Sequence, residues 1–468
     1  MVRMTRALLS AVVAAAALSA GDWPRFRGPN GSGVDSSTGL PAEFGPSKNL
    51  AWKRAVPFSH SSPIVAANRV FLTAHEGESL ITLAFDAASG RPLWRRDERR
   101  ARAHKIFRMN DPASPTPAAD EGNVYVFFPD LGLISYTFDG RERWRHPLGP
   151  FDNFYGMASS PVVAGDLLLL LCDQRTGSFL LALDKQTGRP RWKTDRPAAS
   201  LGWSVPIVYS PSTGQSEIVA IGSGAVDSYY LSTGERRWWL PIGSDGSMGS
   251  PVLHAGTVLV TSLGHDQPWM IDHQAGLERF DRDKNGRISR EEFQGYKEWA
   301  EHFGWMDVDK SDFLDAAEWN SARSFGLGEY GAVAVPLGGS GQLPSTRVRW
   351  RFKRNLPYVP APILYQNVFY MVRTGGIITS LDPSTGALLK QGRTEKALGE
   401  YWASPVAADG KIFLLGEDGK LSVLKAGAQW EVLAVNDLTE ESYATPAISN
   451  GRIFVRTRGT LYCFAARP

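Results

Sequence analysis

Short runs of β-branched, aromatic and leucine residues recur along the chain, and turns that carry Gly or Asp separate them. Each run has the length of a β-strand and lacks the spacing of an amphipathic helix. Four runs make one unit, which opens with a small residue followed by Pro and closes near a Trp. Runs joined by such tight turns predict a four-stranded antiparallel meander.

The unit occurs eight times along the sequence. Its predicted openings are Ser62-Pro63, Ser114-Pro115, Ser160-Pro161, Val205-Pro206, Ser250-Pro251, Ala361-Pro362, Ser404-Pro405 and Thr445-Pro446. The openings are 41 to 52 residues apart, except for one interval of 111 residues that holds an insertion. One such sheet cannot bury both of its faces, so neighbouring units must stack. We therefore predict an all-β fold, an eight-bladed β-propeller of four-stranded antiparallel blades.

The second half of each unit has a recurrent turn, as in residues 183–188 (Leu-Asp-Lys-Gln-Thr-Gly), which lead to Trp192. The Asp accepts hydrogen bonds from the turn backbone, and Gly supplies a positive φ. The Trp is expected to cover the face of the neighbouring unit. The eighth unit has only three strand runs before the chain stops, and residues 49–55, with Trp52, are predicted to supply the fourth and close the ring.

These turns resemble the repeat of the pyrroloquinoline-quinone (PQQ)-like β-propeller family, which includes BamB-like proteins and PQQ dehydrogenases. Residues 22–31 (DWPRFRGPNG) look like the start of exported bacterial members of that family. The resemblance covers the chain from about residue 22 to its end, apart from the insertion. It implies the propeller fold and leaves the function open, because one fold hosts many functions.

Residues 281–292 within the fifth unit match the EF-hand calcium loop at its positions 1, 3, 5, 6 and 12. Hard Ca²⁺ prefers six to eight oxygen ligands. The predicted ligands are Asp281, Asp283, Asn285, the carbonyl of Arg287, Ser289 through water, and Glu292 by both oxygens. We expect Gly286 to allow the bend and flanking helices to complete a calcium-binding insertion at residues 270–328.

A second loop follows 26 residues later. Its predicted ligands are Asp307, Asp309, Ser311, the carbonyl of Phe313, Asp315 and Glu318. The bend position holds Asp312 instead of Gly, so this site is expected to be weaker. The short stretch between the two loops leaves room for one shared helix, and Ile288 and Leu314 are placed to form a short β-bridge.

The N-terminus predicts export. Residues 1–20 hold Arg3 and Arg6, then an uncharged apolar stretch with small residues at its end, which is typical of a cleaved signal peptide. An uncleaved anchor is the alternative. No Cys follows, so a lipid anchor at a lipobox is not expected. We expect a periplasmic or secreted protein that has no transmembrane span after cleavage. We also expect it to be monomeric.

Charge and cysteine content narrow the function classes. The chain has 51 basic and 48 acidic residues and no basic block, so nucleic acid is not an expected partner. Two cysteines, Cys172 and Cys463, exclude a disulfide scaffold and Cys-based zinc or haem sites.

The residues just before each Pro are predicted to lie at one mouth of the central channel, where the inner strands begin. The candidates for binding a cofactor or ligand are His60, His104, Arg108, Asn110, Tyr155, Trp203 and Trp402, beside Asp152, Asn153, Tyr358, Tyr401 and Tyr443. Aromatic residues mixed with His, Asn and Arg suit a polar ligand, a glycan or a peptide. Ordinary loop packing is the alternative interpretation.

The resemblance to PQQ dehydrogenases implies a quinone in this channel, stacked on a Trp and on a ring made by two adjacent cysteines, with Ca²⁺ held by Glu and Asn and an Asp as base. No two cysteines are adjacent here, and no such set can be placed by motif. No catalytic residue is therefore predicted. The favoured hypothesis is an exported, calcium-binding propeller that acts as a binding or scaffold module in the bacterial envelope. The alternatives are a PQQ- and calcium-dependent dehydrogenase and a carbohydrate-binding or polysaccharide-processing propeller.

Overall fold

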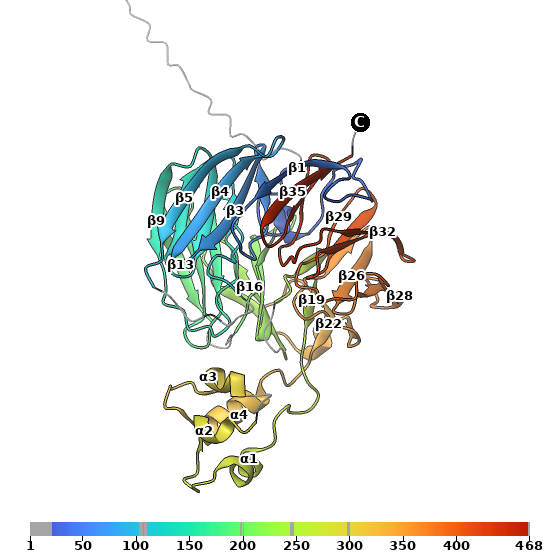
Figure 1. The fold of residues 1–468 in the computed structure, drawn as a ribbon. Coiled ribbons are helices and arrows are strands. Elements are labelled where there is room, and N and C mark those ends of the chain that lie inside the picture. Colours follow the sequence, from blue (N-terminus) through green and yellow to red (C-terminus); the bar gives the residue numbers. More distant parts are fainter. Residues whose placement is uncertain are drawn as a thin grey trace, which may run out of the picture.

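The computed structural model describes residues 21–102, 106, 110–196, 199, 201–243, 248–296 and 300–466. The predicted signal peptide and the candidates His104 and Arg108 lie outside these residues. Eight antiparallel sheets of four strands surround a central axis in the described chain, which confirms the predicted eight-bladed propeller (Figure 1).

Each blade runs from an inner strand to an outer strand. Blades 1 to 4 comprise β2 (Ile64–Ala66), β3 (Arg69–Glu76), β4 (Ser79–Asp86) and β5 (Pro92–Arg99); β6 (Ala118–Ala119), β7 (Asn123–Phe128), β8 (Gly132–Thr137) and β9 (Glu142–Pro147); β10 (Val162–Ala164), β11 (Leu167–Cys172), β12 (Phe179–Asp184) and β13 (Pro190–Asp195); and β14 (Ile207–Tyr209), β15 (Glu217–Gly222), β16 (Gly224–Tyr230) and β17 (Arg236–Ile242).

Blades 5 to 8 comprise β18 (Val252–His254), β19 (Thr257–Ser262), β22 (Gly331–Pro336) and β24 (Trp350–Phe352); β25 (Ile363–Tyr365), β26 (Val368–Arg373), β27 (Ile377–Leu381) and β28 (Leu388–Arg393); β29 (Val406–Ala408), β30 (Lys411–Leu415), β31 (Lys420–Lys425) and β32 (Glu431–Asp437); and β33 (Ala447–Ser449), β34 (Arg452–Arg456), β35 (Thr460–Ala465) and β1 (Leu50–Ala55). A two-residue strand, β23 (Gly341–Gln342), also pairs with β17, and η3 (Ser345–Arg347) follows it.

Blade 8 is closed by a strand from the other end of the chain. β1 pairs with β35 in antiparallel register, with Trp52 opposite Cys463 and Ala55 opposite Thr460. Trp52 is buried in the cluster that joins blades 7, 8 and 1. The ring is thus completed by hydrogen bonds between residues 50–55 and 460–465, and these bonds remove what would be two open sheet edges.

The recurrent Trp packs against a glycine of the next blade. A Cβ on Gly188 would lie 2.5 Å from the ring of Trp144, and the Trp144 indole donates to the carbonyl of Lys185 at 3.0 Å. The same glycine contact joins Trp52 to Gly90, Trp94 to Gly140, Trp192 to Gly234 and Trp350 to Gly386. The turn therefore needs Gly both for its positive φ and for the space that the neighbouring indole fills.

This contact predicts a large effect of Gly188→Ala. Gly188 has a φ of +70° and no room for a methyl group, so the free energy of unfolding is expected to fall by about 3 kcal/mol. The matched control is Gly165→Ala, because Gly165 also has a positive φ, +58°, but open space around it. The control is expected to lose about 1 kcal/mol in urea unfolding. Equal losses for the two variants would show that the indole contact contributes nothing.

The second blade opens at Thr116-Pro117, and the predicted opening at Ser114-Pro115 is wrong. β6 begins at Ala118, directly after Pro117. The Thr116 hydroxyl accepts the backbone N–H of Ser62 at 3.0 Å, which is the role of the residue before Pro in the other blades. The sequence has two possible openings here, Ser114-Pro115 and Thr116-Pro117, and the hydroxyl contact identifies the second.

The residues before these Pro residues form a belt of hydrogen bonds around the axis. The backbone N–H of one blade donates to the hydroxyl of the equivalent residue in the next blade. The bonds run from Ser62 to Thr116 (3.0 Å), Thr116 to Ser160 (2.9 Å), Val205 to Ser250 (3.3 Å), Ala361 to Ser404 (3.0 Å), Ser404 to Thr445 (2.9 Å) and Thr445 to Ser62 (3.0 Å). The hydroxyl belt is interrupted only where the next residue, Val205 or Ala361, has no hydroxyl.

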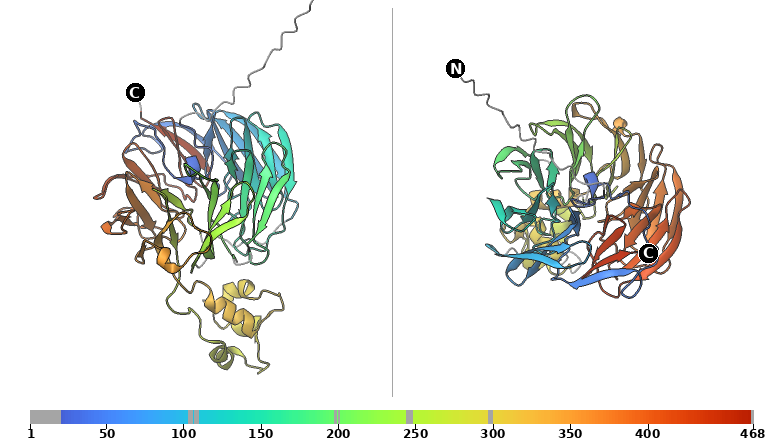
Figure 2. Two further views of the ribbon diagram at one scale, coloured as in Figure 1. Left: turned by 180° about the vertical axis from the view of Figure 1, so that it is seen from behind. Right: turned by 90° about the horizontal axis from the view of Figure 1, so that it is seen from above.

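The N-terminal segment 22–35 crosses the channel and contacts the inner strands of several blades; Figure 2 shows it near the centre of the ring. It bridges β2 at Val65 and β29 at Ala407, and η1 (Pro29–Gly31) lies within it. Arg25 donates to the carbonyl of Pro206 at 2.7 Å, and Arg27 to that of Pro362 at 2.6 Å. Those carbonyls belong to the two blades where the hydroxyl belt is interrupted. The two arginines therefore supply hydrogen bonds to the blades that the belt omits.

Neither arginine has an ion-pair partner among the described residues, and main-chain carbonyls hold both of them. Burial lowers the pKa of Arg25 to about 9, and burial together with the neighbouring Arg25 lowers that of Arg27 to about 9. Both side chains therefore remain charged at neutral pH.

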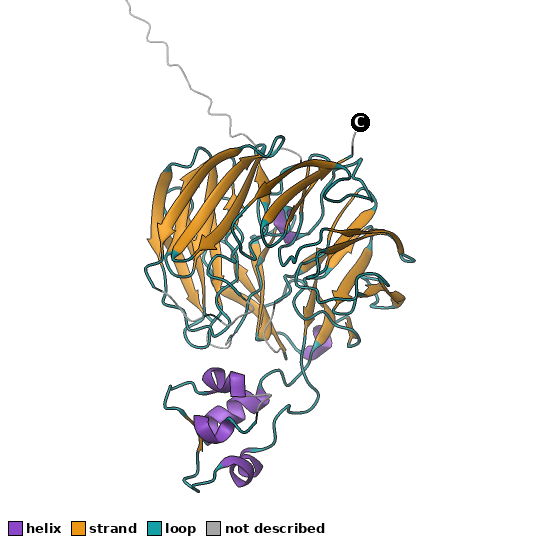
Figure 3. Cartoon of the chain, in the orientation of Figure 1, coloured by secondary structure: helices purple, strands orange, loops and turns teal. Residues whose placement is uncertain are grey.

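A helical insertion leaves blade 5 between β19 and β22 and lies below the ring in Figure 1 and Figure 3. It comprises α1 (His273–Phe280), β20 (Ile288–Ser289), α2 (Arg290–Phe293), η2 (Ala300–His302), α3 (Phe303–Met306), β21 (Phe313–Leu314) and α4 (Ala316–Ser324). Its own core includes Phe280, Phe293 and Trp319. The expected bridge between Ile288 and Leu314 is confirmed. The expected single shared helix is wrong, because α2 ends before Gly295 and η2 and α3 form separate turns.

Candidate functional site

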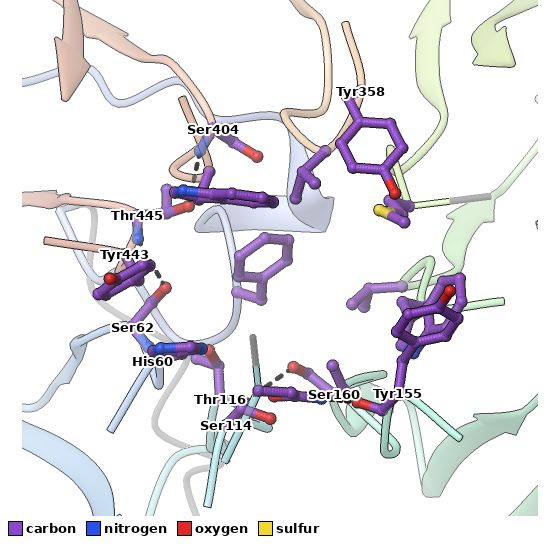
Figure 4. A pocket seen from close by; sticks show the side chains of 18 residues that line it. His60, Ser62, Ser114, Thr116, Tyr155, Ser160, Tyr358, Ser404, Tyr443 and Thr445 are labelled. Carbon is purple, nitrogen blue, oxygen red and sulfur yellow. Dashed lines mark hydrogen bonds between the residues drawn. The ribbon is translucent and has the colours of Figure 1, made fainter. Parts of the chain in front are cut away.

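A pocket of about 200 Å³ lies on the axis at the face of the ring where the inner strands begin (Figure 4). Two rings of residues form its wall. The outer ring is the residue three positions before each opening Pro: His60, Ser114, Ala158, Trp203, Met248, Val359, Trp402 and Tyr443. The inner ring is part of the hydroxyl belt: Ser62, Thr116, Ser160, Ser404 and Thr445, with Val205.

Phe26 of the channel-crossing segment lines the inner part of the pocket. Its neighbours in sequence, Arg25 and Arg27, donate to main-chain carbonyls of blades 4 and 6, so the backbone is anchored on both sides of Phe26 in sequence. The same segment bridges the inner strands β2 and β29, so it crosses the channel beside the pocket.

The aromatic side chains of the pocket are fixed by hydrogen bonds from their polar edges. Trp203 donates its indole N–H to the carbonyl of Gly156 at 2.7 Å. Glu417 accepts from the Trp402 indole at 2.7 Å and from the Tyr443 hydroxyl at 3.0 Å. Because their donors are already used, these side chains offer ring faces to a ligand.

His60 stacks on Tyr443 with ring centroids 4.3 Å apart. Asp111 accepts the backbone N–H of His60 at 2.7 Å and the hydroxyl of Ser59 at 3.0 Å. Burial lowers the pKa of His60 against the opposing effect of Asp111, so the imidazole is neutral at pH 7. No side chain that is charged at neutral pH lines the pocket in the described part of the chain.

The hydrogen bonds of the belt determine whether its hydroxyls act as donors or acceptors toward a ligand. Ser62, Thr116, Ser160, Ser404 and Thr445 each accept one backbone N–H. For none of the five is an acceptor for its own O–H found among the described residues. The inner wall therefore presents O–H donors, which suit the oxygen acceptors of a ligand.

The structure brings together five of the seven residues proposed from the sequence. His60, Asn110, Tyr155, Trp203 and Trp402 all line the pocket, as do Tyr358 and Tyr443. Asp152, Asn153 and Tyr401 do not line it: Asp152 pairs with Arg175, Asn153 donates to the carbonyl of Asp173, and Tyr401 donates to that of Ala397. Sequence reasoning missed Phe26, the hydroxyls, Met248 and Val359. The fixed offset from each Pro was the signal for most of them.

The two loops of the insertion gather the predicted oxygen ligands. One carboxylate oxygen from each of Asp281, Asp283 and Glu292 lies within 4.8 Å of the other two, and Asp307, Asp309 and Glu318 form an equivalent group. Such clusters suit a hard cation such as Ca²⁺.

Loop one is ordered by hydrogen bonds to its carboxylates. Asp281 accepts the N–H groups of Asn285 at 3.1 Å and Gly286 at 2.8 Å. Glu292 accepts from the backbone of Arg282 and of Ser289, both at 2.8 Å. Burial alone would raise the pKa of Glu292, but the bonds from Ser289 and Arg282 outweigh it and lower this pKa. The carboxylate therefore stays ionised, as a ligand must.

Loop two repeats this pattern with two differences. Asp312 takes the bend with a φ of +62°, where loop one has Gly286 at +80°. Arg290 lies 2.8 Å from Asp312 and 3.6 Å from Asp307. A guanidinium so close to the first ligand position repels a cation, which agrees with the expectation that loop two is the weaker candidate site.

These features define a class: an eight-bladed propeller with an axial pocket and a helical insertion at its mouth. The sequence matches the family described as "Outer membrane protein assembly factor BamB" over residues 45–205, 155–282 and 344–467. The chain belongs to this PQQ-like family, since these segments cover well over half of it. No curated protein sequence matches the chain.

Solved structures show the same fold at low sequence identity. BamB from Moraxella catarrhalis is 11% identical with a TM-score of 0.57, over 89% of this chain and 99% of that one. A europium-containing methanol dehydrogenase is 11% identical with a TM-score of 0.59, over 96% and 98%. The quinohemoprotein alcohol dehydrogenase of Comamonas testosteroni is 12% identical with a TM-score of 0.57, over 96% and 81%. An assembly factor and two dehydrogenases thus share this architecture.

Within the described residues, no helix has the length and apolar character needed to span a membrane. Cys172 and Cys463 are both free and buried, in blades 3 and 8.

Proposed function

We propose that this protein is an exported binding module of the bacterial envelope, whose axial pocket holds an uncharged ligand rich in oxygen acceptors. The observation that carries the proposal is the pocket wall: ring faces of Trp203, Trp402 and Tyr443 above a belt of O–H donors, with no charged side chain among the described lining residues. A neutral sugar ring or the backbone of a neutral peptide has this chemistry. The family description, which names outer-membrane assembly, and the signal-peptide pattern support a place outside the cytoplasm.

The described pocket does not fit PQQ. It offers one amide, Asn110, and no carboxylate for the calcium ion and base that the dehydrogenase resemblance implies. Two carboxylates that contact lining residues are already engaged: Asp111 accepts from Ser59, His60 and Ala113, and Glu417 accepts from Trp402 and Tyr443. The two cysteines lie in different blades and so cannot form the ring of adjacent cysteines. A binding role is therefore favoured over the dehydrogenase.

Calcium binding by the insertion is the second part of the proposal. It is supported by two loops with the same carboxylate geometry, joined through the bridge between β20 and β21. In this proposal the ions order the insertion, because the carboxylates repel one another without a cation.

The pocket is tested with panels of neutral mono- and disaccharides and neutral peptides, read by the melting temperature. At least one panel is expected to contain a ligand that raises it saturably in the wild type. Trp402→Ala is expected to lower the affinity for that ligand roughly tenfold, because one aromatic ring face of the pocket is lost. Trp239→Ala is the control, since Trp239 lies on the outer strand β17, far from the axis. Dye-linked turnover of an alcohol or sugar with added PQQ would contradict the proposal, as would a Trp402→Ala variant that binds like the wild type.

A further inference from the structure

The insertion contacts the ring at blade 3 through one arginine. Arg175 lies in the loop between β11 and β12, and its Nη1 approaches the carbonyl oxygens of Gly304 (3.3 Å), Trp305 (3.2 Å) and Asp307 (2.9 Å). Its Nε and Nη2 bind the two carboxylate oxygens of Asp152 at 3.0 and 2.9 Å. The guanidinium is therefore held by the ring on one edge and holds the C-terminal end of α3 with the other.

A second contact joins the insertion to the pocket wall. The Tyr155 hydroxyl lies 3.2 Å from Nδ1 of His302, the residue directly before α3. Tyr155 lines the pocket and meets Trp203 edge to face, with ring centroids 5.6 Å apart. Burial lowers the pKa of His302, so this contact is made by a neutral imidazole at pH 7.

Asp307 connects these contacts to the second loop. Its backbone carbonyl is bound by Arg175, while its carboxylate occupies the first ligand position and accepts the N–H groups of Ser311 and Asp312 at 3.0 and 3.1 Å. Its side chain is only 2% exposed. The ring and the ligand cluster thus hold the same residue from its two ends.

We propose that cation binding in loop two and docking of the insertion at the pocket mouth are coupled, so that calcium sets the position of the pocket residue Tyr155. The inference rests on the calcium binding proposed above and adds its consequence for the pocket. Without a cation, Asp307, Asp309 and Glu318 repel one another, and the loop gives up the geometry that presents the Asp307 carbonyl to Arg175. With the cation bound, α3 is fixed, and His302 supports Tyr155 at the wall.

Coupling of this kind is reciprocal. If the ion favours docking, then docking must raise the affinity of loop two by the same factor. The pocket therefore responds to calcium through loop two, and calcium affinity responds to a residue of the ring that touches no ion. This reciprocity allows the inference to be tested with calcium alone as the probe.

The test uses the full chain carrying Glu292→Gln, which silences loop one and leaves loop two to be titrated by calorimetry. Adding Arg175→Gln is expected to weaken calcium binding roughly 5- to 10-fold. Arg191→Gln is the matched control, because Arg191 lies in the same blade and its ion pair among the described residues is with Asp184. It should leave the affinity unchanged. Tyr155→Phe removes the second contact with little effect on folding and is expected to weaken binding by a smaller factor.

Amide hydrogen exchange measures whether calcium binding changes the pocket wall around Tyr155. Calcium is expected to slow exchange in residues 152–157 of the Glu292→Gln protein, and not after Glu318→Gln is added. Unchanged calcium affinity in both the Arg175→Gln and the Tyr155→Phe variants overturns the coupling and leaves calcium binding intact. Calcium binding without slower exchange in residues 152–157 does the same. Absence of any calcium uptake overturns both the coupling and the proposed calcium binding.

Discussion

Replacing Glu292 by Gln is expected to weaken calcium binding in loop one roughly 100-fold, because the change removes a charge and a bidentate ligand at once. The propeller is expected to keep its melting temperature, since the core of the insertion, around Phe280, Phe293 and Trp319, is separate from the blade cores. Loop two should keep its weaker site. Titration calorimetry on the two proteins measures both affinities.

Glu291→Gln is the matched control for this experiment. Glu291 is the exposed neighbour of Glu292 and is not part of the ligand cluster. The substitution therefore removes the same charge from the same helix without removing a ligand. The control is expected to change the affinity of loop one less than threefold, as for an exposed charge. A wild type that takes up no calcium at millimolar concentration, or a Glu292→Gln protein that binds like the control, would refute the assignment.

Weakening the closing strand is expected to have the largest effect on stability. Trp52→Ala should lower the free energy of unfolding by about 3–5 kcal/mol, because the indole is 6% exposed and fills the space over Gly90. Deleting residues 49–55 removes the whole of β1 and is expected to open the ring. Urea unfolding measures the first variant and thermal melting the second.

Lys53→Ala is the control on the same strand, because the Lys53 side chain is exposed and its neighbour Trp52 is not. Its expected effect lies within about 0.5 kcal/mol. If the protein without residues 49–55 melted like the full chain, closure by β1 would make no contribution to stability.

The fold could be predicted from the sequence because the residues that specify each blade are close together in the chain and recur in every repeat. Each Asp-to-Gly turn and each Trp acts between neighbouring blades, so the same few residues recur at every interface and the blade count follows from them. The misplaced opening at Ser114-Pro115 shows the limit of this reasoning. The start of β6 after Pro117 and the contact of the Thr116 hydroxyl with the backbone of the previous blade distinguish it from the correct opening two residues later.

The pocket was predictable in part. The offset from each Pro placed His60, Trp203 and Trp402 at the channel mouth, because a repeat puts equivalent positions at equivalent heights. The contribution of Phe26 was not predictable, since the segment around it reaches blades 4 and 6 through Arg25 and Arg27, over separations of 181 and 335 residues. No local pattern encodes such contacts. Calcium binding remains a prediction that the paired carboxylate clusters support.

The closure of blade 8 constrains the order in which the protein is made. β1 leaves the ribosome early, but its partner β35 is near the other end of the chain, so the ring cannot close until almost the whole sequence has been synthesised. At roughly 5–20 residues per second, β1 and the channel-crossing segment wait on the order of 20–80 s without their partners. During this time the strand edge and Trp52 are open to wrong pairing. A chaperone that holds the N-terminal segment should therefore raise the yield of this protein more than that of a propeller closed by sequence neighbours.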